Sequence, residues 1–311
     1  MLSRVAENLY WAGRYLQRAE NTARLIGVNA NLVLDLPRGV TFGWQPLVDI
    51  SGASERYSEL YKEADETGVV RFLALDDRNA SSILSSLRQS RECLRTTREC
   101  MPTEVWERLN DLYLFVQEKG ERGIARARRQ EFLQQVVEGA ILIYGMLTTN
   151  MSRDVGFQVL RIGTNLEQAD MTTRIIDVRS TTLVRRKGAE DLAPFQNIQW
   201  MSVLKSLTAY QMYRRTLKSR VEGPGVLRFL LQDRDFPRSV TFCLGMIAST
   251  LPRLPPQRKV ERALQRTRAL VQDASIAGLI ESERGLHRLV DEIQIGLADL
   301  HEAVSQAYFR N

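Results

Sequence analysis

The stretch that decides the fold is Met1–Leu34, which reads MLSRVAENLYWAGRYLQRAENTARLIGVNANLVL. Apolar residues recur along it in alternating steps of four and three positions, which predicts one straight stripe on a single α-helix. Further apolar residues, Tyr10, Trp11, Tyr15 and Leu25, lie outside the stripe. A helix that is apolar beyond one face is contacted on more than one side, so we expect it to be central to the fold. The stripe consists of Val5, Leu9, Ala12, Leu16, Ala19, Ala23, Ile26, Ala30 and Val33.

The polar residues of this predicted helix fall into two groups, since successive side chains are rotated by about 100°. One group flanks the apolar stripe, and the other lies largely on the opposite side. Because the helix is expected to be central, its ionic side chains should lie within protein or in a cleft. The two groups are, in that order, Gln17, Glu20 and Arg24, and Arg14, Arg18 and Asn21.

The composition is that of a globular protein. The chain has 311 residues, of which 44% are hydrophobic and 26% are charged, which is enough for one or two compact domains. A net charge of +6 permits an anionic partner. However, basic and acidic residues are interleaved along the helices, a pattern typical of solvated helix surface, so nucleic acid is not the favoured partner.

The cysteines and the apolar segments bear on the location of the protein. Cys93, Cys100 and Cys243 form no dense pattern, which argues against a disulfide scaffold and fits a reducing compartment. The N-terminus has no apolar run typical of a signal peptide, and the longest apolar stretch, Gly139–Leu147, is too short to span a membrane. We therefore expect a cytoplasmic protein without membrane contact.

Nearly every other segment shows helical periodicity, so the fold class predicted is all-α. Residues 68–75 are rich in β-branched and apolar residues, but their helical flanks favour a short buried helix. The charged segment 121–129 precedes a helix that ends near 150, and 185–194 is a polar linker. The remaining helices are expected at 44–62, 79–100, 102–119, 152–184, 196–220, 226–231, 236–251, 257–273 and 276–308.

The second half of the chain repeats the first. Residues 13–26 align with 163–176 at an offset of 150, with Gly, Leu, Ala, an acid, Thr, Arg and Ile in common. Matches follow in the same order for Trp44 with Trp200, 71–76 with 228–233, 82–83 with 239–240, and 105–109 with 260–264. This order predicts a duplicated helical unit of about 150 residues, with repeat 1 at about 1–150 and repeat 2 at about 151–311. Two such amphipathic units are expected to form one pseudo-twofold helical bundle.

The repeat singles out two charged pairs. Glu20 and Arg24 are four residues apart, as are Asp170 and Arg174 in the second half. Such pairs are either structural clamps within and between helices or parts of a binding site. If the two copies face each other across the pseudo-twofold, they form one cluster suited to a substrate with both carboxylate and amine groups.

Two arginines of the first helix are not repeated. Thr164 and Gln168 stand in the second half where Arg14 and Arg18 stand in the first. This asymmetry indicates an anion or carboxylate site in the first half, since the guanidinium fork suits planar anions. The alternative is that these are surface positions at which the residue type has drifted between the two halves.

Other candidate groups have more ordinary roles. Asp76 with Ser82, and Asp233 with Ser239, are typical of N-caps rather than of catalytic groups. The two histidines lie in no metal-binding spacing, and no glycine-rich phosphate loop is present. We therefore expect no cofactor or metal in this chain. The basic runs 126–129 and 185–187 are expected to be solvated.

The opening motif M-L-S-R-V-A-x-x-L-Y-W-x-G-R-Y-x-x-R-A-E-N-x-A-R resembles that of the bacterial alpha-E family, and the resemblance covers essentially the whole chain. Further matches are M-S-R-D-x-G at 151–156, L-x-x-G-x-x-L-E-x-A-D at 160–170, D-x-x-x-P-R-S-V at 233–240, and Tyr308-Phe309. The sequence departs from the family pattern at Thr164, Gln168, Ala80 and Phe236. The family-like positions are Arg14, Arg18, Glu20, Asn21, Arg24, Asp76, Glu167, Asp170, Arg174, Asp233 and Ser239.

The resemblance implies one alpha-E domain over 1–311 that works with a circularly permuted ATP-grasp protein. A transglutaminase-like peptidase is a second candidate partner, and homo-oligomerisation is left open. The implied reaction is ATP-driven amide or peptide bond formation, with ATP and Mg on the partner. Glu20 or Asp170 would hold or deprotonate an amine, and the substrate-binding residues would be Arg14, Arg18, Asn21, Arg24 and Arg174. The alternative is a non-catalytic interaction scaffold in a peptide synthesis or proteolysis system.

Overall fold

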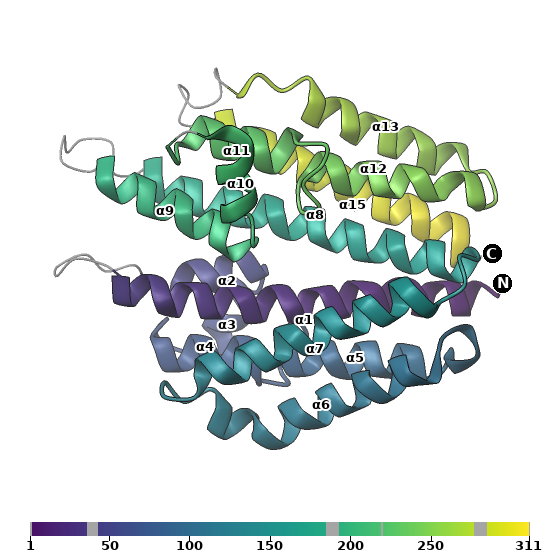
Figure 1. The fold of residues 1–311 in the computed structure, drawn as a ribbon, viewed down its shortest axis with the longest axis horizontal. Coiled ribbons are helices and arrows are strands. Elements are labelled where there is room, and N and C mark those ends of the chain that lie inside the picture. Colours follow the sequence, from purple (N-terminus) through teal and green to yellow (C-terminus); the bar gives the residue numbers. More distant parts are fainter. Residues whose placement is uncertain (1, 36–42, 185–192, 219, 277–284, 311) are drawn as a thin grey trace. The chain divides into compact units, whose positions relative to one another are not determined.

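The structure is a computed structural model that describes residues 2–35, 43–184, 193–218, 220–276 and 285–310. All regular elements in these ranges are helices, which confirms the all-α prediction (Figure 1). The chain divides into two compact units, Met1–Thr164 and Asn165–Asn311. The long helix α8 (Val155–Val184) contributes its first ten residues to the first unit and the rest to the second. No helix within the described ranges is both long and apolar enough to cross a membrane.

The first unit is built around α1 (Ser3–Asp35), which packs on α5 and α7. Tyr10 and Leu25 lie outside the predicted stripe, yet both are fully buried. The helix is therefore covered on more than one side, as its sequence predicts. The other helices of this unit are α2 (Gln45–Ser51), α3 (Ser54–Leu60), α4 (Glu66–Ala74), α5 (Ile83–Arg95), the 3-10 turn η1 (Arg98–Cys100), α6 (Thr103–Gly123) and α7 (Arg129–Asn150).

Within the first unit, α1 crosses the start of α8 at two matched glycines. A Cβ atom on Gly163 would lie 2.2 Å from the Tyr10 carbonyl oxygen, and one on Gly13 would lie 2.7 Å from the Leu160 carbonyl oxygen. The contact is reciprocal under the sequence offset of 150, because residue 160 matches residue 10. Only glycine permits two helix backbones to approach this closely.

The helices described in the second unit follow the order of those in the first. Within the described residues, the rest of α8 is followed by two helices, a helix with the sequence Arg-Phe-Leu, a serine-capped helix, a 3-10 turn and two long helices. Their bounds are α9 (Ala193–Ser206), α10 (Tyr210–Leu217), α11 (Gly223–Gln232), α12 (Val240–Thr250), η3 (Leu251–Arg253), α13 (Arg258–Gln272) and α15 (Gly285–Tyr308). The predicted linker at 185–194 lies mostly outside the described residues.

Two helices predicted as continuous are broken, so those predictions were wrong. Gly52 ends α2 in the left-handed region with φ of 69°, which divides the segment 44–62. Thr208 has φ of 52° and divides the segment 196–220 in the same way. The helix predicted to reach Cys100 ends at Arg95 and is followed by a 3-10 turn. The segment 68–75 is a buried helix, as predicted.

Candidate functional site

The polar side chains of α1 that flank its apolar stripe form a hydrogen-bonded row. Gln17 Nε2 donates to Glu20 Oε2 over 3.2 Å and to Asn21 Oδ1 over 3.1 Å. Arg24 Nε donates to Glu20 Oε1 over 2.8 Å. Because these pairs are three or four residues apart, one helix positions all four side chains. The row therefore joins three of the predicted site residues, Glu20, Asn21 and Arg24.

Burial of this row gives it its physical character. Gln17, Glu20 and Asn21 are each at most 3% exposed. Asn21 was predicted on the side away from the stripe, and its burial agrees with the expectation that α1 is covered on more than one side. A carboxylate and a guanidinium removed from water attract strongly, but each has lost its hydration. Loss of either partner would leave the charge of the other uncompensated. Because Gln17 and Arg24 each donate to a different oxygen of Glu20, the row fixes its carboxylate in one orientation.

Arg14 and Arg18 lie along aromatic side chains of the same helix. The Arg14 guanidinium is 5.3 Å from the Trp11 ring centroid, and its Nη1 donates to Tyr10 Oη over 3.4 Å. The Arg18 guanidinium is 5.5 Å from the centroid of the Tyr15 ring, which itself stacks on Trp11. Such cation–π contacts hold the plane of a guanidinium while its N–H edge is suited to a planar anion.

The second copy of the charged pair lies on α8. Arg174 Nε donates to Asp170 Oδ2 over 2.9 Å, and both side chains are more exposed than those of the first pair. The polar residues nearby fasten α8 to the turn that precedes α12. Thr172 Oγ1 donates to the Arg238 carbonyl, and Gln168 Nε2 donates to the Pro237 carbonyl. Gln168, where the family pattern has arginine, therefore has a structural contact in this chain.

The two predicted capping sites each contain a serine cap and an aspartate turn. Ser82 accepts from the Ser85 N–H and Ser239 from the Phe242 N–H, so both serines are N-caps as predicted. The aspartates are not N-caps, which corrects that prediction. Asp76 accepts from the Arg78 N–H, and Asp233 accepts from the N–H groups of residues 235 and 236, so each closes the turn before its capped helix.

Asp76 also belongs to an ion pair. Its carboxylate accepts from the Arg78 guanidinium over 2.7 and 2.9 Å and from the Tyr61 hydroxyl over 2.7 Å. The Arg78 hydrogen bonds, and then that of Tyr61, hold the pKa of Asp76 at about 2. With both oxygens bound, Asp76 is committed to the turn rather than to a substrate.

The predicted basic run at 126–129 has a specific partner. Arg126 and Arg129 both donate to the Glu66 carboxylate, the latter over 2.6 Å. These bonds, Arg126 first, hold the pKa of Glu66 at about 2 against the opposing effect of burial. Arg129 is buried and its guanidinium lies 5.8 Å from the Trp44 ring centroid. The expectation that this run is solvated was therefore wrong for Arg129.

The sequence did not predict a cluster of one histidine and two aspartates in the second unit. His287 Nδ1 lies 2.6 Å from Asp177 Oδ1, and its Nε2 lies 3.4 Å from Asp291 Oδ2. The hydrogen bond to Asp177 raises the pKa of His287. One ligand atom from each residue lies within 4.8 Å of the others, so the group has the chemistry to hold a metal ion. The spacing of His287 and Asp291 was visible in the sequence, but Asp177 is 110 residues away from His287.

The fold and this row of side chains define a helical protein in which a buried glutamate pairs with a partly buried arginine on the central helix of the first unit. The sequence model of Alpha-E, described as "a predicted alpha-helical domain with a conserved ER motif", matches residues 1–309. The chain therefore belongs to the Alpha-E family.

The curated relatives are longer than this chain. Proteins of Mycobacterium bovis and of Mycobacterium tuberculosis, each named as uncharacterized, are 24% identical to it over 293 residues. The match covers 85% of this chain and 32% of each relative, so the chain spans about a third of their length. No solved structure matches.

Proposed function

We propose that this chain is the helical partner of an ATP-grasp amide or peptide ligase, and that α1 binds the carboxylate or amine end of a substrate or intermediate. The observation that carries the proposal is the Gln17–Glu20–Arg24 row, in which Gln17 and Glu20 are buried, with Arg14 and Arg18 held against aromatic rings on the same helix. In this mechanism the arginines bind a carboxylate or phosphate oxygen, and Glu20 orients or deprotonates an attacking amine.

The length of the relatives is consistent with a partner. In each mycobacterial protein about two thirds of the chain lies outside the matched part. A segment of this kind, joined there to a longer polypeptide, is expected for a component that works with a second activity. The ATP-grasp partner itself is inferred from the motif resemblance of the sequence.

The duplicated, pseudo-twofold bundle is part of the same proposal. The reciprocal crossing at Gly13 and Gly163 and the common order of elements support it.

The test is ATP-dependent amide formation by the two purified proteins together, followed by mass spectrometry of the product. Glu20→Gln keeps the shape of Glu20 but removes its charge, and it leaves an acceptor oxygen for only one of the two donors, Gln17 and Arg24. If Glu20 acts on the amine, the rate should fall by about a hundredfold. Glu118→Gln, an exposed glutamate on α6, is the matched control and should leave the rate unchanged. An unchanged rate for folded Glu20→Gln removes Glu20 from the mechanism.

A second function is favoured by one observation. Both oxygens of Glu20 are already bound within α1, which is what a structural clamp requires. Under this alternative the chain is a non-catalytic scaffold that docks the partner. Glu20→Gln would then lower the melting temperature but leave product formation intact once the variant is folded.

A further inference from the structure

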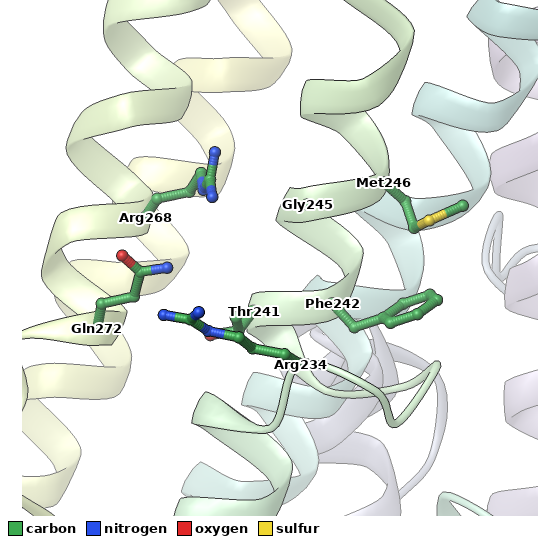
Figure 2. A pocket seen from close by; sticks show the side chains of 7 residues that line it. All are labelled: Arg234, Thr241, Phe242, Gly245, Met246, Arg268 and Gln272. Carbon is green, nitrogen blue, oxygen red and sulfur yellow. The ribbon is translucent and has the colours of Figure 1, made fainter.

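A cavity of about 360 Å³ lies within the second unit, and its lining includes none of the residues predicted to bind a substrate. It opens between α12 and α13, next to the turn that follows α11 and carries Arg234 (Figure 2). Its lining residues are Arg234, Thr241, Phe242, Gly245, Met246, Arg268 and Gln272.

Three polar side chains extend into the gap between the two helices. Figure 2 shows the guanidinium groups of Arg234 and Arg268 and the amide of Gln272 directed toward this space. The Phe242 and Met246 side chains extend to the other side of α12 in the same view. A ligand in the cavity therefore meets N–H donors from two elements, the turn before α12 and the helix α13.

The two arginines of the cavity are not held by acidic side chains of the part of the chain that the structure describes. Neither has an ion pair or a side-chain hydrogen bond with the residues that the structure describes. Asp233, which precedes Arg234 in the chain, accepts with its Oδ1 from the N–H groups of residues 235 and 236. Along α13, basic residues outnumber acidic ones by five to one, and this excess adds to the positive potential.

The floor of the cavity is open because of a glycine. A Cβ atom on Gly245 would meet no heavy atom within 4 Å, so the space beside this residue is empty. Thr241 on the same wall is buried and its hydroxyl donates to the Leu231 carbonyl, which fixes that side chain.

We infer that this cavity binds the dianionic phosphate group of a phosphate monoester. Two guanidinium groups match two negative charges, whereas one carboxylate would leave a positive charge unbalanced. Guanidinium N–H groups and an amide N–H also fit the oxygens of a phosphate. The inference does not depend on the function proposed for α1, because it rests on different residues in a different unit.

The test is titration of the full chain with three small anions at constant ionic strength. Binding is monitored through the amide NMR signals of α12. The probes are methyl phosphate as the dianion, dimethyl phosphate as a model of a nucleic-acid backbone, and acetate. We expect methyl phosphate to bind at least about tenfold more tightly than either of the others. If dimethyl phosphate or acetate binds as tightly as methyl phosphate, or if methyl phosphate does not bind, the inference is overturned.

Matched variants separate the cavity from general charge. Arg268→Gln should weaken methyl phosphate binding by about tenfold, whereas Arg262→Gln on the same helix should change it less than twofold. Gly245→Leu fills the floor and should abolish binding. Because α12 gains helix propensity, the urea midpoint of this variant should be at or above that of wild type, and this measurement separates loss of binding from unfolding. Gly145→Leu on α7, where a Cβ also meets open space, is the control for that effect. Unchanged binding in Arg268→Gln and Gly245→Leu would also overturn the inference.

Discussion

The two long helices α1 and α8 carry the same spacing of charged residues in different surroundings. The ion pairs Glu20–Arg24 and Asp170–Arg174 have nearly equal lengths, 2.8 and 2.9 Å. The exposed fractions are 3% for the Glu20 side chain and 16% for that of Arg24, against 17% and 34% in the second pair. The spacing of four residues is thus sufficient to form the bond, but the neighbours of each helix decide what the bond contributes.

One neighbour of each pair explains part of the difference. Gln17 donates to Glu20 on α1, and the residue at the matching position of α8 is Glu167, which is also buried. A carboxylate has no N–H to donate to Asp170. On α1 the Glu20 carboxylate therefore accepts hydrogen bonds from two donors, and this arrangement is not reproduced on α8.

The largest effect is expected where the two helices cross. Gly163→Ala should lower the free energy of unfolding by more than about 3 kcal/mol, because its Cβ would lie 2.2 Å from the Tyr10 carbonyl oxygen. Gly13→Ala should cost about 2 kcal/mol, since the corresponding distance is 2.7 Å. Urea denaturation measures both. Gly145→Ala, which meets open space on α7, should be neutral or stabilising. A larger loss for Gly13→Ala than for Gly163→Ala would contradict this account of the crossing.

The next effect compares the two ion pairs directly. Arg24→Met leaves the buried Glu20 carboxylate without its cation and should cost about 3 kcal/mol of unfolding free energy. Arg174→Met removes the partner of the more exposed Asp170 and should cost less than about 1 kcal/mol. Both changes keep the side-chain stem, so packing is matched. Equal losses in urea denaturation would show that burial does not distinguish the pairs.

A third change makes α1 resemble α8. Gln17→Glu places a second carboxylate beside Glu20 and should destabilise the protein by about 2 kcal/mol at pH 8. Because like charges and burial both favour protonation of such a pair, the deficit relative to wild type should shrink at pH 5. Urea midpoints of the two proteins at both pH values test this. A deficit that is independent of pH would mean that the lost amide hydrogen bonds, not charge repulsion, cause it.

The regular helices could be predicted from sequence because their signals are local. The stripe on α1 and the serine caps of α5 and α12 depend on residues within one or two turns, and all three are present. The breaks at Gly52 and Thr208 were missed. Threonine carries no sequence signal for the left-handed region, since its branched side chain disfavours it. That conformation is set by the tertiary fold.

Only part of the candidate site could be predicted from the sequence. The i,i+4 pairs followed from spacing, but the burial of Asn21 depends on which helices cover α1. The partners Glu66 of Arg129 and Asp177 of His287 come from segments 63 and 110 residues away. The departure at Phe236 is also explained only by the fold. Where the first turn has Asn79 donating to the Phe72 carbonyl, the second has Phe236 stacked on Phe229 at 4.8 Å.

The smallest effect concerns a contact that α8 has and α1 lacks. Asp177 holds His287 of α15, whereas Gly27 stands at the matching position of α1. Because Asp177 raises the pKa of His287 in the folded protein, the contact contributes stability that is full below the ordinary histidine pKa of about 6.5. The contribution is lost as pH rises through the higher pKa of the folded state. Since the His287 side chain is 57% exposed, we expect less than about 0.5 kcal/mol. Urea midpoints of wild type and Asp177→Asn between pH 5 and 8 measure it. The two curves should converge at high pH. A gap between the midpoints that widens as pH rises would contradict the expected direction of the pH dependence.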